Sequence, residues 1–206
     1  MNLKPNKIIL DGFWRVGKST FCKKMELGGW LFILEPDHNK ESGLALSPVD
    51  LNFYYAISHL SNMLRFTTKK KRVILERCLI ASFAYNYAMN NKVWKIIWNS
   101  TETSDFLKRN KVYCFYRTYK NFLADMSHYP KNQMIPPDVN LRRFYLRFRE
   151  ALSLVANKYP HNVQLVKLNR NQFVSDYFTK RKDDFFNDQD TTNEDIFLRQ
   201  KNISKL

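Results

Sequence analysis

The chain has 206 residues, of which 44% are hydrophobic and 15% aromatic; this composition predicts one globular domain with a buried core and excludes a disordered chain. No apolar run approaches the roughly 18 residues of a membrane-spanning helix, and the first residues are polar, so we expect a cytoplasmic protein with no secretory signal and no membrane partner. The formal net charge is +15.

The positive charge is unevenly distributed along the chain. Residues 183–206 hold six acidic and three basic residues, which leaves 31 basic and 13 acidic residues, a net charge of +18, in residues 1–182. Such a surface attracts polyanions and anionic metabolites. A composition that is merely rich in lysine explains the charge equally well, so a DNA partner and an incidental charge are both open.

Cysteines and histidines indicate neither disulfides nor a zinc site. Cys22, Cys78 and Cys114 are odd in number and lack paired spacing, which predicts reduced and mostly buried thiols. The four histidines are scattered along the chain and show no metal-ligand spacing.

Apolar segments of strand length and helix length alternate along the chain, a pattern typical of βαβ units and a parallel sheet. Strands are predicted at about 7–11, 30–35, 72–76, 111–117 and 162–168. Helices are predicted at about 18–27, 49–65, 78–90, 93–99, 102–109, 119–126 and 139–158. We therefore expect an α/β three-layer sandwich with a five-stranded parallel sheet flanked by helices, in a single domain over residues 1–180.

Glycines and prolines predict where several elements end. Gly28-Gly29 closes the first helix, Pro136-Pro137-Asp138 opens the last one, and Pro160 ends it. Residues 127–137 lack apolar periodicity and are predicted to form a mobile lid. Residues 181–206 are polar and rich in Asp and Asn, which predicts a flexible tail.

The segment after the first strand matches the phosphate-binding pattern G-x-x-x-x-G-K-[ST]. It consists of Gly12, Phe13, Trp14, Arg15, Val16, Gly17, Lys18, Ser19 and Thr20. Two glycines let backbone N–H groups point at an anion, and the following helix adds its positive dipole end. Lys18 is placed to reach the β- and γ-phosphates, and the Ser19 hydroxyl to bind Mg²⁺. The sequence therefore predicts a fold of the P-loop NTPase type that binds a nucleoside triphosphate and Mg²⁺.

Acidic and basic residues follow two further strands. Glu35 ends the predicted second strand, and Glu76-Arg77 ends the third. Ligands of open parallel sheets lie beyond the carboxyl ends of the strands, so we expect these side chains to face the bound phosphates. Glu76 is a candidate metal ligand, and the planar fork of Arg77 suits a phosphate or the attacking oxygen.

Three segments resemble the thymidylate kinases and the related deoxynucleoside kinases. Residues 12–20 are similar to the P-loop of thymidylate kinases that carry an arginine inside the loop. Residues 76–86, Glu-Arg-Cys-Leu-Ile-Ala-Ser-Phe-Ala-Tyr-Asn, resemble the segment D-R-Y-x-x-S-S-x-A-Y-Q of that family, and deoxynucleoside kinases have E-R-S at its start. Glu35-Pro36 matches the E-P that both groups place after the second strand.

The resemblance implies a kinase that transfers the γ-phosphoryl group of ATP to a deoxynucleotide or deoxynucleoside, and it implies a homodimer. Its implied catalytic residues are Lys18, Arg15, Glu35 and Arg77: Arg15 clamps the transferred group, Arg77 holds the acceptor, and Glu35 matches the base of deoxynucleoside kinases. ATP contacts are implied for Gly12, Phe13, Trp14, Val16, Gly17, Ser19 and Thr20, and metal contacts for Ser19 and Glu76. Substrate contacts are implied for Tyr54, Tyr55, His59, Glu76, Ser82, Tyr85 and Asn86.

Trp14 departs from the family pattern. Thymidylate kinases with this type of loop have an aspartate there, which binds the sugar 3′-hydroxyl, and a tryptophan cannot accept that hydrogen bond. A second hypothesis is therefore a kinase that acts on a base or terminus within a DNA strand. A third is a nucleotide-dependent binding module or motor, ranked last because no apolar strand is followed by Asp-Glu.

Four weaker signals have competing interpretations. Lys69–Arg72 suits nucleic-acid binding but is more typical of a solvated connection. Arg142, Arg143, Arg147 and Arg149 fit either the ATP side of the site or solvent, and Arg117 is a candidate for phosphate contact. Trp94, Trp98 and Phe106 are expected to pack in the core or on a partner.

Overall fold

In the computed structural model, the five strands of the described residues join one parallel sheet in the order β2-β3-β1-β4-β5. The structure describes residues 7–35, 47–69, 72–127, 135–136 and 138–181. The strands are β1 (Lys7–Gly12), β2 (Leu31–Ile33), β3 (Val73–Glu76), β4 (Val112–Tyr116) and β5 (Val163–Lys167). The predicted five-stranded parallel sheet is therefore confirmed. The central strand β1 has β3 and β4 as its neighbours, so the loops after these three strands lie together.

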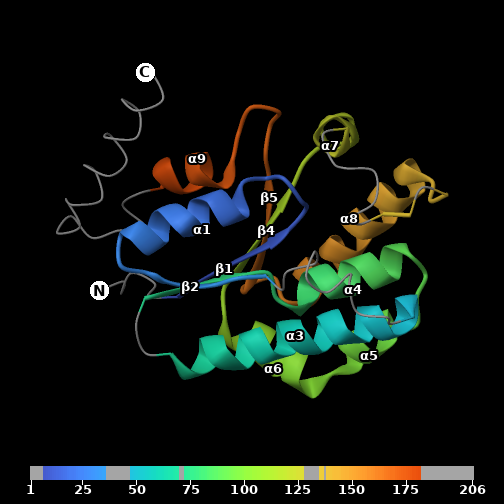
Figure 1. Cartoon of the computed structure of the whole chain (residues 1–206), viewed down its shortest axis with the longest axis horizontal. Coiled ribbons are helices and arrows are strands. Elements are labelled where there is room, and N and C mark those ends of the chain that lie inside the picture. The colour runs from blue at the N-terminus through green and yellow to red at the C-terminus, as the bar shows by residue number, and fades with distance from the viewer. Residues whose placement is uncertain (1–6, 36–46, 70–71, 128–134, 137, 182–206) are drawn as a thin grey trace.

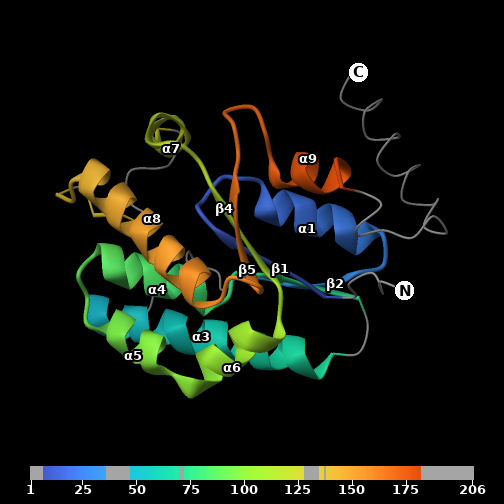
Figure 2. The ribbon, with the colours of Figure 1, turned by 180° about the vertical axis from the view of Figure 1, so that it is seen from behind.

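Helices cover both faces of the sheet and complete three layers (Figures 1 and 2). One face carries α1 (Lys18–Leu27) and α9 (Val174–Thr179), which pack together. The other face carries α3 (Pro48–Thr68), α4 (Leu79–Ala88), α5 (Val93–Asn99), α6 (Thr101–Arg109) and α8 (Leu141–Lys158). Helix α7 (Tyr119–Met126) follows β4. None of the helices in the described ranges combines the length and the apolar character that crossing a membrane requires.

The central strands are apolar throughout because helices cover both faces of the sheet. Ile8, Ile9 and Leu10 of β1 and Ile74 and Leu75 of β3 have no exposed surface. Parallel sheets buried on both sides show such continuous apolar runs instead of alternation. The three cysteines are also buried and form no disulfide, and burial raises the pKa of each thiol.

The first helix ends as predicted, and the last long helix begins later than predicted. The N–H groups of Gly28 and Gly29 donate to carbonyls of the last turn of α1, and Gly29 has a φ of 83°. Helix α8 begins at Leu141 and not at the predicted position near 139, because the Asn140 side chain accepts from the N–H of Arg143 at 3.0 Å and so forms the N-cap.

Helix α9 is absent from the sequence prediction. Its six residues are too few for a helical period to be recognised, and its position depends on distant contacts. The Phe178 ring stacks on Phe21 of α1 with 4.7 Å between ring centroids. The Asp176 carboxylate caps the helix by accepting from the N–H of Phe173 at 2.7 Å.

Two predicted features lie outside the described residues. Of the predicted lid at 127–137, the structure describes only residues 127, 135 and 136. Of the predicted tail at 181–206, it describes only residue 181.

Candidate active site

The loop between β1 and α1 has the left-handed backbone of an anion-binding turn. Gly12 and Gly17 have φ angles of 100° and 85°, and Arg15 has a φ of 55°. Gly12 also lies directly against β4, since a Cβ at this position would be 2.1 Å from the carbonyl oxygen of Phe115. The loop is anchored to the sheet by the N–H of Phe13, which donates to the same carbonyl at 2.8 Å. Both glycines of the motif are thus required by the backbone itself.

Gly12→Ala is expected to destabilise the fold by about 3–5 kcal/mol, because the added methyl meets β4 backbone that cannot move aside. Gly29→Ala is the matched control: Gly29 also has a positive φ, of 83°, but a Cβ added there would meet nothing within 4 Å. The control should lose only about 1 kcal/mol. Chemical denaturation measures both values, and equal losses would contradict the steric explanation.

Lys18 and Ser19 begin α1 and connect it to the neighbouring strands. The Lys18 side chain is 4% exposed, and its Nζ donates to the carbonyl oxygen of Phe13 at 2.5 Å. The Ser19 hydroxyl donates to Oε1 of Glu76 at 2.5 Å. A hydroxyl and a carboxylate are oxygen ligands of the kind Mg²⁺ prefers, and Mg²⁺ sites commonly use few protein ligands, with phosphates and water filling the others. The Ser19–Glu76 pair therefore fits the expected metal.

Burial and neighbouring charges shift the pKa values of Lys18, Glu76 and Arg77. Burial lowers the pKa of Lys18 to about 8, helped by repulsion from Arg77 and opposed by Glu76, Glu35 and Asp11. Burial raises the pKa of Glu76, although Lys18 and the Ser19 hydroxyl favour its ionised form. Burial also opposes the charge of Arg77, but Glu35 and Asp11 outweigh it and raise the pKa.

Arg77 lies at the turn after β3, and its guanidinium is held on several sides. Its Nε is 2.7 Å from Oε1 of Glu35, and its Nη1 donates to the carbonyl oxygen of Gly12 at 3.2 Å. The Trp14 ring lies over the guanidinium, with 5.3 Å from Cζ to the ring centroid. Its backbone has a φ of 62°, and its N–H donates to Leu10 at 2.8 Å.

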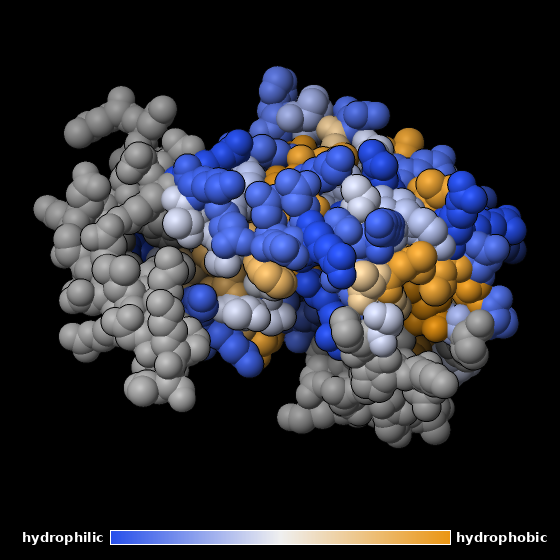
Figure 3. All heavy atoms as spheres, turned by 90° about the horizontal axis from the view of Figure 1, so that it is seen from above, coloured by the Kyte–Doolittle hydropathy of each residue, from blue (hydrophilic) through white to orange (hydrophobic). Residues whose placement is uncertain are grey.

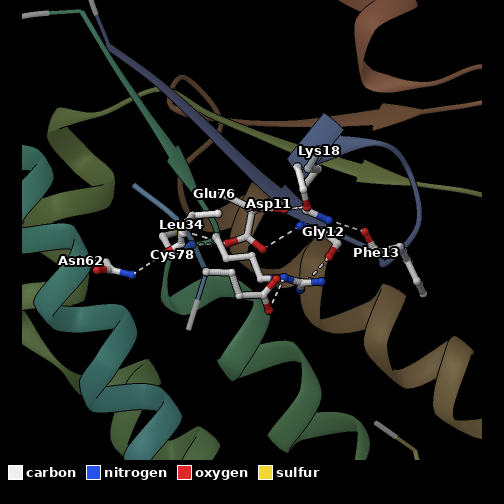
Figure 4. A network of polar contacts seen from close by, with 11 residues as sticks. Asp11, Gly12, Phe13, Lys18, Leu34, Asn62, Glu76 and Cys78 are labelled. Atoms are coloured by element: carbon white, nitrogen blue, oxygen red, sulfur yellow. Dashed lines mark hydrogen bonds and ion pairs between the residues drawn. The ribbon is translucent and has the colours of Figure 1, made fainter. Parts of the chain in front are cut away.

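Asp11 is a buried residue of this network that the sequence prediction missed. Figure 4 shows its carboxylate between Gly12 and Cys78. Oδ1 accepts from the N–H of Gly12 at 2.6 Å, and Oδ2 accepts from the N–H and the Sγ of Cys78 at 2.9 and 3.0 Å. Burial raises the pKa of Asp11, opposed by Arg77 and by these hydrogen bonds. An aspartate directly before the first glycine was the available signal.

A pocket of about 790 Å³ opens over the loop. Its lining comes from the loop, α1, the end of β3 and the start of α9, and consists of Trp14, Arg15, Gly17, Lys18, Ser19, Thr20, Lys24, Glu76, Arg77, Phe173 and Ser175. The structure thus brings together predicted residues from two distant segments, and Glu35 joins them through its ion pair with Arg77. Phe173 and Ser175 belong to the unpredicted helix region.

Two of the residues with implied ATP contacts, Phe13 and Val16, have buried side chains. The Phe13 side chain is 1% exposed in an aromatic cluster with Phe122, Tyr145 and Phe148, and its N–H is bonded to Phe115. The Phe13 side chain therefore belongs to the core, and the ATP contact implied for this residue stays a prediction. Val16 is also fully buried.

Most of the implied substrate residues are not among those that line the pocket. His59, Ser82 and Asn86 are 3%, 7% and 1% exposed, and the Asn86 amide donates to the carbonyl oxygen of Ser82 within α4. Ser82 and Asn86 are thus buried in the helix packing, and the substrate contacts implied for them stay predictions. Tyr85 packs with the rings of Trp14 and Phe144, and Tyr54 contacts Tyr55 on α3.

Arg117, which the sequence suggested as a candidate for phosphate contact, is held by protein groups. It is 2% exposed, and its guanidinium donates to the carbonyl oxygens of Asn169, Arg170 and Gln172 and pairs with Asp125 at 3.0 Å. Its role is to hold the loop between β5 and α9, which continues into Phe173 at the pocket.

The aromatic residues among the remaining weak signals pack against other rings. The ring of Trp98 stacks on Phe83 at 5.0 Å, and Trp94 contacts the same ring edge-on. Phe106 is buried against Phe66. Of the four arginines of α8, Arg147 is half-buried and the other three are exposed. Arg147 and Arg149 lie over tyrosine rings at 5.0 Å.

Solved structures similar to this chain are nucleotide and deoxynucleoside kinases. A thymidylate kinase from Candida albicans has 14% sequence identity and a TM-score of 0.61, covering 87% of this chain and 90% of its own. A deoxyadenosine kinase from M. mycoides with bound dCTP has 12% identity and a TM-score of 0.57, with coverages of 86% and 97%. A thymidylate kinase from Ehrlichia chaffeensis has 15% identity and a TM-score of 0.53, with coverages of 86% and 96%.

No protein-family model and no curated protein matches the sequence. At these low identities the structural likeness defines the fold alone. The chain has the α/β three-layer fold of the P-loop thymidylate and deoxynucleoside kinases.

Proposed function

We propose that this chain is an ATP- and Mg²⁺-dependent kinase that phosphorylates a deoxynucleoside or deoxynucleotide. The observation that supports it most is the convergence of Lys18, Glu76 and Arg77 on one pocket, with Glu35 ion-paired to Arg77. The names of the structural neighbours, thymidylate kinase and deoxyadenosine kinase, agree with such an activity.

The P-loop side of the pocket is assigned to the triphosphate. Lys18 and the N-terminus of α1 hold its charge, and Arg15 clamps the transferred γ-phosphoryl group. Ser19 and Glu76 would hold Mg²⁺, which would neutralise negative charge of the triphosphate. Trp14 and Phe173 line the same pocket with apolar surface.

The Glu35–Arg77 side of the pocket is assigned to the acceptor, and its charge favours a hydroxyl over a phosphate. Among the described residues of this network, the three carboxylates of Asp11, Glu35 and Glu76 interact with two cations, Lys18 and Arg77. A phosphate acceptor would bring further negative charge beside Glu35, whereas a neutral hydroxyl would not.

In the proposed reaction the hydroxyl oxygen attacks the γ-phosphorus in line, and the bond from that phosphorus to the bridging oxygen of ADP breaks. Glu35 takes the hydroxyl proton, and Arg77 orients the oxygen.

A hydroxyl acceptor within a DNA strand is the alternative supported by the charge of residues 1–182. Hydrophilic residues dominate the middle of the face that carries α1 and α9 (Figure 3), where Lys23 is exposed and Lys24 lines the pocket. Contacts to several phosphates make affinity fall steeply with salt. The cytoplasmic location and the homodimer expected from the sequence stay predictions.

The proposal is tested by offering γ-labelled ATP with deoxynucleosides, their monophosphates, and single- and double-stranded DNA. Label transferred to an acceptor supports a kinase, and the acceptor identifies its class. Release of free phosphate alone, stimulated by DNA, would contradict the proposal and favour a motor. Salt titration of DNA binding separates the two kinase alternatives, since binding that does not respond to salt would argue against a DNA acceptor.

A further inference from the structure

We propose that Asp11 is a positioning residue that keeps Arg77 in a fixed position relative to the P-loop. The acceptor and the triphosphate are thereby held at one fixed separation. This inference rests on the proposed kinase function and adds a residue to it. Asp11 is fully buried, so it acts through other residues and does not touch a substrate itself.

Asp11 connects the two halves of the site with one carboxylate. It lies at the carboxyl end of the central strand, where Oδ1 accepts from the N–H of Gly12, the first residue of the P-loop, at 2.6 Å. Oδ2 accepts from the N–H of Cys78, the residue after Arg77, at 2.9 Å. The two halves are 67 residues apart in sequence, and this side chain is a direct polar link between them (Figure 4).

The turn that carries Arg77 needs such support. Arg77 has a φ of 62°, a backbone conformation that residues with a Cβ adopt only where their surroundings hold it. Its own N–H is held by Leu10, and the next N–H, that of Cys78, is held by Asp11. Asp11 also attracts the guanidinium electrostatically. The N–H groups of Arg77 and Cys78, which flank the strained backbone of Arg77, are therefore both hydrogen-bonded to residues of β1.

The P-loop does not depend on Asp11 to the same extent. The N–H of Phe13 donates to Phe115 at 2.8 Å, and the carbonyl oxygen of Val16 accepts from Val174 at 3.0 Å. Loss of the carboxylate should therefore disturb the Arg77 turn and leave the phosphate cradle largely intact.

The chemistry requires two acceptor oxygens in this position. Three donors, two N–H groups and the Cys78 thiol, point at the carboxylate. An asparagine has one oxygen and an NH₂ group that only donates, so one of the backbone N–H groups would face another donor. Asp11→Asn thus preserves the size of the side chain and breaks one of its two attachments.

The experiment is a double-mutant cycle with Asp11→Asn and Arg77→Gln. Asp11→Asn should lower kcat/KM for the acceptor about 30-fold and change the Kd for ATP less than threefold. In the Arg77→Gln background the same substitution should cost less than threefold, because Asp11 acts through Arg77. Cys78→Ala, which keeps the backbone N–H, should stay within threefold of wild type.

Each outcome decides the proposal. Losses that multiply independently in the double mutant would overturn it, as would an Asp11→Asn protein that no longer binds ATP. A merely structural role would lower the melting temperature without changing kcat/KM per mole of ATP-binding protein. A wild-type chain that binds ATP but phosphorylates no acceptor would overturn the proposed function, and this inference with it. An active wild type with a failed cycle would overturn the inference alone.

Discussion

Lys18→Met is expected to lower kcat/KM for phosphoryl transfer by at least about 1000-fold and to stabilise the nucleotide-free protein at pH 7. The loss of activity follows from removing the cation that the P-loop supplies to the triphosphate, in a buried site where electrostatic terms are large. The gain in stability follows from removing a buried ammonium that only the ligand fully compensates.

The sign of the stability change follows from the pKa of Lys18. Burial lowers it to about 8 in the folded protein, from 10.5 for an exposed lysine. Between these values the unfolded chain binds more protons, so the wild-type free energy of unfolding rises with pH across this window. At pH 7 the charged form costs about 3 kcal/mol, which the methionine avoids. Near pH 10.5 the advantage of the variant should therefore disappear.

Denaturant unfolding at pH 7 and pH 10 measures the change in stability, and transfer of label from γ-labelled ATP measures the loss of kcat/KM. Calorimetry should also show weaker ATP binding, because Lys18 supplies charge to the triphosphate. Lys23→Met, at an exposed position on α1, is the matched control. It should change the free energy of unfolding by no more than about 0.5 kcal/mol and leave the affinity for ATP unchanged. A Lys18→Met protein that is less stable than wild type at pH 7 would contradict the expected burial cost, and retained ATP affinity would contradict the site itself.

Glu35→Gln is expected to lower kcat about 100- to 1000-fold with little change in the Kd for ATP. The amide keeps a hydrogen-bonding oxygen near Nε of Arg77, which the carboxylate now contacts at 2.7 Å, but it cannot take a proton from an acceptor hydroxyl. The Glu35 side chain is 18% exposed, so it is open to an acceptor.

The same substitution distinguishes the two acceptor chemistries by the direction of the effect. If the acceptor were a phosphate, removing a negative charge beside it would leave activity unchanged or raise it. Single-turnover transfer from labelled ATP measures the chemical step, and Glu26→Gln on the exposed face of α1 is the charge-matched control. Activity of Glu35→Gln at or above the wild-type level would therefore reject Glu35 as the base.

Local sequence signals were sufficient for the sheet and the P-loop. The strands were recognisable because both faces of the sheet are covered, so Ile8–Leu10 and Val73–Leu75 are apolar without interruption. The P-loop is a contiguous motif whose glycines are required by backbone angles of 100° and 85°. Glu35 and Glu76-Arg77 were predicted from topology, since they follow strands whose carboxyl ends meet at one edge.

Only the tertiary structure shows which residues contact and support the side chains at that edge of the sheet. Asp11 contacts Cys78 and Ser19 contacts Glu76, over sequence separations of 67 and 57 residues, and Arg117 holds a loop more than 50 residues away. The burial of Ser82 and Asn86 and the existence of α9 likewise depend on packing between helices. A local pattern records the backbone and burial preferences of one segment, whereas such contacts depend on where the chain returns in space, which no single segment specifies.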